Sequence, residues 1–499
     1  MLADVQLSGV AFSHDQQTGL RYASVNYSVG KDTTAVTSGK SSQVWIHHHS
    51  CKTAPPTGLE KVLDLLDEIT SLSGKLPIDI EFAITQKNQL QKLWLLQARP
   101  LVVAEMPISS RKHAEKLQQV ENFINRCSQK DPFILGDKAL FGVMPDWNPA
   151  EMIGVLPNPM ALSIYQYIIG DEVWSSSRSQ IGYNDVKHLP LIHSLGGKPY
   201  VDIRLSLNSF LPKDLDKKIA EKWINHCLEV IEKEKTLHDK IEFDVAITCI
   251  DFDWLNNQYI LKSAGLEKDQ IIEFKKSLSK LTSNIINQKN WSIEDNLKHL
   301  QKLELKRIEL QKIKSRNPFI IVTKLKILIE EIKKNGSFPF SILARYAFIG
   351  MSLLKSLKKN KLITNEEFDS ILKSIPTVAS KFSNDIKRFN DNKVSINYLI
   401  KKYGHLRPNS YDINSQSYKE TKNIFYKMCE NKNFSYYKKS KFRAYDIISR
   451  KRVKIQKKMS EIGINVTFEK LSMFIIESIS AREKAKFEFM RSLNDFIDY

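Results

Sequence analysis

The chain has 499 residues, 42% of them hydrophobic, which is enough for about two to four domains with sizeable apolar cores. Its five cysteines are scattered, odd in number and without a Cys-x-x-Cys spacing, which argues against a disulfide framework or a zinc knuckle. The net charge of +19 arises after residue 200, because residues 1–200 hold 18 basic and 19 acidic side chains.

The basic part of the chain interleaves lysine with glutamate, as in Glu304-Leu-Lys306-Arg-Ile-Glu309. This pattern is typical of a solvated helix surface, and a nucleic-acid-binding face is the weaker alternative. The start of the chain lacks the basic and apolar regions of a signal peptide, and no apolar run reaches about 18 residues. We therefore expect a cytoplasmic protein with neither a membrane nor a nucleic acid among its partners.

The first hundred residues predict strands near 6–12, 21–28, 33–37 and 43–47, followed by a helix. Thr57 is the expected helix cap, and Glu60, three residues later, completes a capping box. One face of this helix is apolar and is expected to pack on the sheet through Leu59, Val62, Leu63, Leu66 and Ile69.

Two segments with period-two alternation follow, 77–84 and 93–100, separated by the polar stretch 86–89. This pattern predicts a hairpin. With a turn centred near residue 89, Glu81 pairs with Gln97 and Asp79 pairs with Arg99, and directly opposed residues share one face. Carboxylate and amide oxygens suit Mg²⁺, and an arginine suits a transferring phosphate. The alternative is an Asp–Arg pair on a solvated sheet edge.

The hairpin resembles the last hairpin of the ATP-grasp domain in phosphoenolpyruvate synthases, pyruvate phosphate dikinases and rifampicin phosphotransferases. Segments 5–19 and 30–39 resemble earlier parts of the same domain, in the same order. The resemblance implies that Glu81 and Gln97 bind Mg²⁺–ATP, that Arg99 is the catalytic contact to the transferred phosphate, and that Asp79 supports them.

Two parts of that family are not found in the sequence: the lid subdomain that precedes this region and the Gly-Gly-x-x-Ser-His-type motif of the phosphohistidine domain. We therefore expect a fragment or subunit of an ATP-dependent phosphotransferase that is inactive alone and needs separately encoded lid and phosphohistidine domains. The alternative is a non-catalytic remnant that acts as a helical binding or scaffold protein.

The remaining chain predicts mostly helices. A connecting helix is expected over 109–129, Asn148-Pro149 and Asn158-Pro159 each open a helix, and 180–212 forms turns and strands. Leu300, Leu303, Leu310 and Ile313 predict one buried helix face, and a last helix covers about 465–495. The predicted fold is α+β: a partial ATP-grasp domain over 1–104, a connector over 105–212, and a helical substrate-binding domain over 213–499.

One distinctive motif lies in the helical part, where His405, Arg407 and Asp412 surround a Gly/Pro loop. It resembles a Gly-His-Arg-Gly-Pro segment of the rifampicin phosphotransferase branch, with the arginine shifted by one position. The resemblance implies a substrate or interdomain role. The alternative is a structural loop in which Asp412 caps the next helix.

His47, His49 and Cys51 would share one face of a strand, which is possible metal-ligand geometry. No fourth ligand lies nearby in sequence, and the resemblance assigns no metal there. A polar strand end is the simpler interpretation.

Overall fold

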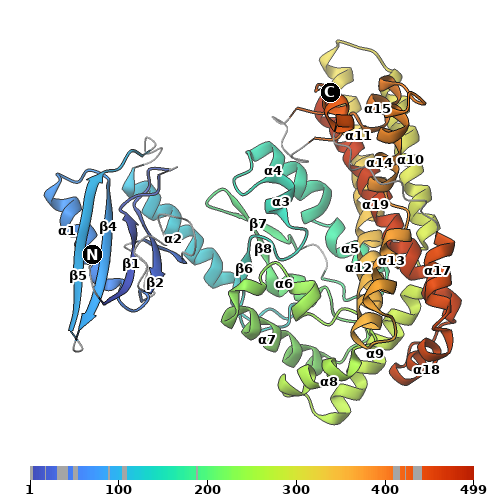
Figure 1. The fold of residues 1–499 in the computed structure, drawn as a ribbon, viewed down its shortest axis with the longest axis horizontal. Coiled ribbons are helices and arrows are strands. Elements are labelled where there is room, and N and C mark those ends of the chain that lie inside the picture. Colours follow the sequence, from blue (N-terminus) through green and yellow to red (C-terminus); the bar gives the residue numbers. More distant parts are fainter. Residues whose placement is uncertain are drawn as a thin grey trace. The chain divides into compact units, whose positions relative to one another are not determined.

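The computed structural model describes residues 4–16, 18–30, 43–48, 54–87, 90–103, 109–186, 189–407, 416–421, 423–430 and 441–499. The chain divides into two compact units, Met1–Asn122 and Phe123–Tyr499 (Figure 1). The first unit is built on an antiparallel sheet of five strands and the second is mostly helical. The α+β fold class is therefore confirmed at this level.

The sheet of the first unit has the strand order β3-β2-β1-β4-β5. Its strands are β1 (Val5–Phe12), β2 (Tyr22–Val29), β3 (Gln43–His48), β4 (Ile78–Lys87) and β5 (Leu90–Pro100). They agree with the expected strands, except that the strand expected at 33–37 lies outside the described residues. Helix α1 (Glu60–Leu72) completes the unit together with most of α2 (Ser110–Cys127), whose last residues belong to the second unit. The connecting helix expected over 109–129 is confirmed.

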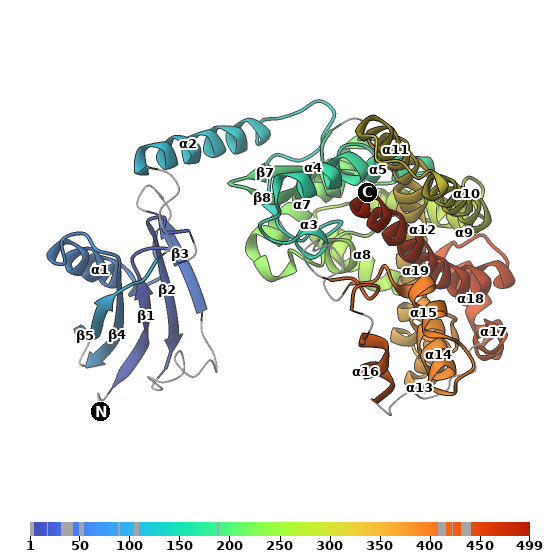
Figure 2. The ribbon, with the colours of Figure 1, turned by 90° about the horizontal axis from the view of Figure 1, so that it is seen from above.

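Helix α1 covers one face of this sheet (Figure 2). Leu59, Val62 and Leu66 pack there against the inward residues of β1, β2 and β4. The predicted cap is wrong: the helix begins at Glu60 after Leu59, with no side-chain cap, and the Gly58 N–H donates to the Glu60 carboxylate at 2.8 Å. Glu60 thus satisfies the backbone donor two residues before it, whereas a capping box with Thr57 would use the donor three residues before it.

A β-bulge sets the register of the β4–β5 hairpin. Glu81 pairs with Gln97 and Asp79 with Arg99, as the sequence predicts, but Phe82 pairs with Leu95, so that Leu96 is an extra residue. Residues on a strand alternate between faces, and without the bulge Gln97 would lie on the same face as Leu95. The bulge therefore brings Gln97 and Arg99 to the face that carries Asp79 and Glu81.

Residues 123–212 pack into the second unit instead of forming a separate connector, because side chains such as Tyr165, Trp174 and Ile203 belong to its main core. The expected boundaries at 104 and 212 thus differ from the observed division at 122. This segment forms β6 (Phe141–Gly142), α3 (Pro149–Ile153), α4 (Pro159–Tyr165), η1 (Gln166–Gly170), α5 (Val173–Gln180), β7 (Ile192–Leu195), β8 (Lys198–Asp202) and α6 (Ile203–Asn208).

The helices of the rest of the unit surround two long ones, α12 (Phe338–Lys359) and α19 (Phe468–Asp498), which pack closely along each other. The others are α7 (Lys217–Lys233), η2 (Lys235–Leu237), η3 (Ile241–Val245), α8 (Trp254–Ser263), α9 (Lys268–Ile286), α10 (Ile293–Lys312), α11 (Pro318–Glu331), η4 (Ile332–Ser337), α13 (Asn365–Ser374), α14 (Val378–Asn390), α15 (Ile396–Tyr403), α16 (Ile424–Glu430), α17 (Lys441–Ser449) and α18 (Arg452–Ile462).

The buried helix face predicted for residues 300–313 is largely confirmed. Leu300, Leu303 and Leu310 are buried in α10, but Ile313 lies beyond the end of that helix and is 42% exposed. One described helical stretch, Pro318–Lys359, is apolar and long enough to cross a membrane by composition alone, and 72% of its most apolar window is buried inside the protein. A core helix that is mostly buried inside a domain passes the same test of length and composition.

Candidate functional site

The four predicted groups of the hairpin lie on the sheet face opposite α1. Arg99 is held by Asp79, whose two carboxylate oxygens accept from the Arg99 Nε at 2.8 and 2.9 Å. Asp79 is buried, whereas 53% of the Arg99 side chain is exposed. The hydrogen bond that Arg99 donates to Asp79 raises the pKa of Arg99, and the charge of Glu81 adds to this shift. Among the described residues, no group accepts from the two terminal amino groups of Arg99, which are free to meet an anion.

Glu81 and Gln97 are directly opposed on that face. Glu81 is half-buried and Gln97 is exposed, and within the described part of the chain neither side chain makes a hydrogen bond. Their oxygens are therefore available to a ligand. No group of three or more His, Cys, Asp or Glu side chains suited to holding a metal is present among the described residues. A cation at this place would need additional ligands, such as water and phosphate oxygens.

The possible metal site at the end of β3 is only partly within the structure, because His49 and Cys51 lie outside the described residues. His47 stacks on Trp45 with ring centroids 5.0 Å apart. His48 is buried against Tyr22 and against His113 of α2. Both described histidines thus have packing roles.

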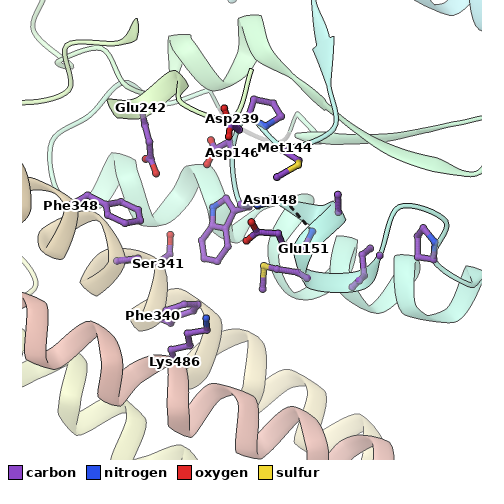
Figure 3. A pocket seen from close by; sticks show the side chains of 18 of the residues that line it. Met144, Asp146, Asn148, Glu151, Asp239, Glu242, Phe340, Ser341, Phe348 and Lys486 are labelled. Carbon is purple, nitrogen blue, oxygen red and sulfur yellow. Dashed lines mark hydrogen bonds between the residues drawn. The ribbon is translucent and has the colours of Figure 1, made fainter. Parts of the chain in front are cut away.

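The second unit contains a cavity of about 1040 Å³ that the sequence analysis did not identify. The loop 144–148, helices α3 and α4, η3, α12 and α19 form its wall (Figure 3). Aromatic side chains of Trp147, Phe243, Phe340 and Phe348 line it together with charged groups. This mixture of apolar and polar walls is typical of a binding site for a small organic molecule.

The backbone is strained at two residues that line the cavity. Trp147 and Asn148 have φ angles of 55° and 35°, in the left-handed region that residues other than glycine seldom adopt. Asn148 nevertheless caps α3 as predicted, since its side chain accepts from the Glu151 N–H at 3.2 Å, and Gly154 ends the helix. Packing that holds two such residues in place is frequent at functional sites.

Two buried ion pairs form part of the cavity wall. Arg178 of α5 binds Asp146 through both terminal nitrogens, each at 2.8 Å. Arg345 of α12 binds Glu242 at 2.7 Å, with only 3% and 13% of the two side chains exposed. Burial raises the pKa of Glu242, and the charge of Arg345 opposes that shift.

Aromatic rings separate the guanidinium groups of this wall. The Phe210 ring lies 4.3 Å from Arg178 and 5.4 Å from Arg345, and the Phe348 ring lies 5.4 Å from Arg345 and 5.1 Å from Arg482. Each ring face is favourable for a cation. We call this run of five side chains the arginine ladder. It extends from the buried core to Arg482, which is at the cavity and whose Nε is buried without a hydrogen-bond partner.

Close to Arg482 on the same face of α19 is Lys486, an exposed residue at the cavity (Figure 3). No described carboxylate forms an ion pair with Lys486. Opposite it, the exposed Asp239 and Glu151 also border the cavity. A ligand with both polar groups and an apolar surface would match these walls.

Of the motif formed by His405, Arg407 and Asp412, the structure describes the first two residues. His405 and Arg407 border a narrow, mainly apolar cavity of about 60 Å³ that shares the α3 and α4 wall with the larger one, and Asp412 lies outside the described residues. Arg407 donates to Asn494 at 3.1 Å. His405 packs against Phe487, and its Nε2 is buried without a hydrogen-bond partner. Both residues are near the cavity wall rather than in the large cavity itself.

The larger cavity was missed because its charged residues come from segments far apart in the sequence. In the sequence, Arg345 is the one charged residue of the otherwise apolar segment 338–354. A charge in such an apolar segment requires a partner, and this was the available signal. Which acidic residue pairs with it depends on the tertiary fold.

No protein-family model and no curated protein matches this chain. The geometry of its own residues therefore carries the functional argument.

Replacing Glu242 by Gln leaves the Arg345 charge buried without a counter-ion. We expect this variant to lose about 3–5 kcal/mol of unfolding free energy, as is usual when one partner of a buried pair is removed. Replacing both residues, with Glu242→Gln and Arg345→Met, should recover most of that loss. Urea denaturation of the full chain measures both effects.

The matched control is the exposed pair of Asp214 and Lys280. Asp214→Asn should change the unfolding free energy by less than about 1 kcal/mol. A Glu242→Gln variant as stable as this control would show that the buried pair does not hold the cavity wall together.

His405 should make the protein sensitive to acid. Burial lowers its pKa from 6.5 to about 3, and the charges of Arg491 and Arg307 add to this effect. Between these two pH values the unfolded chain binds a proton that the folded chain does not, so stability falls as the pH decreases through this range. His405→Leu should remove this component, giving a smaller loss of the urea midpoint between pH 7 and pH 4 than in the unchanged protein. Equal losses would contradict the assignment.

Proposed function

We propose that the chain is a component of an ATP-dependent phosphotransferase of the phosphoenolpyruvate synthase or rifampicin phosphotransferase kind, and that its first unit is part of an ATP-grasp domain. The observation that carries this proposal is the arrangement of Arg99. Asp79 fixes its guanidinium through Nε, so that the terminal amino groups are presented together with Glu81 and Gln97 on one open sheet face.

The donor set fits a magnesium nucleotide. Mg²⁺ is usually bound by one or two carboxylates together with phosphate oxygens and water. Glu81 would supply the carboxylate, Gln97 the amide oxygen, and the triphosphate the remaining oxygens. The bound metal would neutralise charge on the phosphates during transfer.

Arg99 would act on the phosphate itself. Phosphoryl transfer depends mainly on positioning and on stabilising the charge of the moving group. A guanidinium held at one end by a buried carboxylate is oriented before the nucleotide arrives, which reduces the entropy lost on binding. Asp79 is thus a positioning residue for Arg99.

The acceptor would bind in the large cavity of the second unit. Arg482 and Lys486 can contact anionic or hydroxyl groups, and the four aromatic side chains can cover an apolar part of the molecule. His405 and Arg407 would contribute through the shared α3 and α4 wall. Complete turnover would require the lid and phosphohistidine domains of the resembled family.

The alternative is a non-catalytic binding or scaffold protein. The observation in its favour is that the Asp79–Arg99 pair is complete without a ligand, as a cross-strand pair on a solvated face would be. This alternative predicts no nucleotide binding.

Calorimetric titration of the full chain with Mg²⁺–ATP distinguishes the two proposals. We expect saturable binding that Glu81→Ala and Arg99→Ala together weaken by at least about 100-fold, since each removes a charge-assisted contact of about 1.5–3 kcal/mol. The control carries Gln91→Ala and Lys92→Ala, at the opposite end of the same hairpin, and should bind normally. Binding that survives the first pair of substitutions would refute the site assignment, and no binding by the unchanged protein would favour the scaffold.

A further inference from the structure

The connection between α10 and α11 has an unusual charge pattern. Residues 310–329 contain no acidic side chain and five basic ones: Lys312, Lys314, Arg316, Lys324 and Lys326. The flanking carboxylates have partners, because Glu309 binds Lys306 at 3.1 Å and Glu330 accepts a hydrogen bond from Tyr167. Asp495 of α19 also reaches this connection, where it accepts from Gln311 at 2.6 Å, but it is paired with Arg307 at 2.7 Å. The corner therefore carries an excess of basic side chains.

The same corner exposes large apolar side chains. Helix α11 buries Lys324 and Leu328 against the unit, while its outward side carries Phe319, Ile320, Val322 and Ile327, which are 83%, 42%, 51% and 37% exposed. Ile313, expected in the core, is exposed at the same connection. A group of exposed large apolar side chains bordered by polar ones frequently marks an interaction surface. The outward side of α11 thus has the composition of a surface that is covered by a partner.

The corner is held in this conformation. The buried Lys324 donates to the Ile313 carbonyl at 3.0 Å, and its ammonium lies 3.8 Å from the centre of the Tyr499 ring. Asn317 caps α11 by accepting from the Phe319 N–H at 3.0 Å. Figure 1 shows the connection, in yellow, at one end of the helical unit. The apolar side chains are thus presented outward by an ordered turn.

We propose that this corner binds an anionic lipid surface. Phe319, Ile320 and Val322 would enter the boundary between headgroups and acyl chains, while the exposed lysines and Arg316 would contact the phosphates of the headgroups. Interfacial helices bind anionic membranes through apolar side chains that enter the lipid and basic side chains around them that contact the headgroups. Such a site needs neither a signal peptide nor a spanning segment, which were the grounds for expecting no membrane partner.

Other occupants fit less well. A second copy of the chain would bring the same basic side chains together, and like charges in apposition oppose association. A single-stranded nucleic acid binds through aromatic stacking as well as charge, and Phe319 is the only aromatic residue among 310–329. A lipid surface satisfies both the apolar and the basic side chains.

Co-sedimentation of the full chain with vesicles tests the proposal. We expect binding to phosphatidylcholine vesicles that contain phosphatidylglycerol, little binding to phosphatidylcholine alone, and weakening as salt is raised. Phe319→Ser with Ile320→Ser should reduce the partition coefficient by at least about tenfold, because two large apolar side chains no longer enter the lipid. The control is Leu255→Ser with Tyr259→Ser on α8, which are 63% and 74% exposed and should leave binding unchanged.

A second set of variants tests the charges. Lys312→Gln, Lys314→Gln and Arg316→Gln together should abolish the preference for anionic vesicles, whereas Lys217→Gln, Lys218→Gln and Lys268→Gln, which remove the same charge elsewhere, should not. Absence of vesicle binding, equal loss in corner and control variants, association of the chain with itself through this corner, or binding of RNA in preference to vesicles would each overturn the proposal. Because these measurements use no nucleotide, their outcome is independent of the Mg²⁺–ATP titration.

Discussion

The pairing of Arg345 with Glu242 is the interaction on which the second unit most depends. A guanidinium in the middle of an apolar helix is tolerated only when its charge is matched. The ion pair of Arg345 with Glu242 of η3 links the central helix α12 to the segment that forms one side of the large cavity. The Arg178–Asp146 pair connects α5 to the loop before α3 in the same way. The arginine ladder joins both pairs, so that the cavity wall is one electrostatic unit.

These ion pairs explain how charged side chains can be buried at the cavity wall. Arg178 and Arg345 line the cavity but are neutralised by buried carboxylates, whereas Arg482 pairs with the partly exposed Glu483 and Lys486 has no ion-pair partner among the described residues. The wall thereby combines structural ion pairs with the charge of Lys486, which is available to a ligand. The same combination recurs in the first unit, where Asp79 occupies one end of Arg99 and leaves the other end exposed.

The sequence predicted those features that depend on neighbouring residues or on simple periodicity. Strand alternation identified β1, β2, β4 and β5, and the pairing of Glu81 with Gln97 and Asp79 with Arg99 is confirmed. The doubled Leu95-Leu96 within an alternating strand was the local sign of the bulge. By contrast, the Glu242–Arg345 pair joins residues about a hundred positions apart, and the α1 cap depended on backbone geometry that Thr57 alone does not specify. Contacts of this kind are set by the packed fold and not by spacing.

The extra residue Leu96 shifts the alternation of side chains between the two sheet faces along β5 by one position. Residues 90–95, between the turn and the bulge, pair with β4 in one register. Residues 97–100, beyond the bulge, pair with β4 in a register that is shifted by one residue. Changes in loop length that shift the distal pairing can consequently be absorbed at the bulge without rotating Arg99 away from Asp79. The hairpin thus has room for evolutionary variation at its tip, while the end that carries the charged groups keeps its orientation.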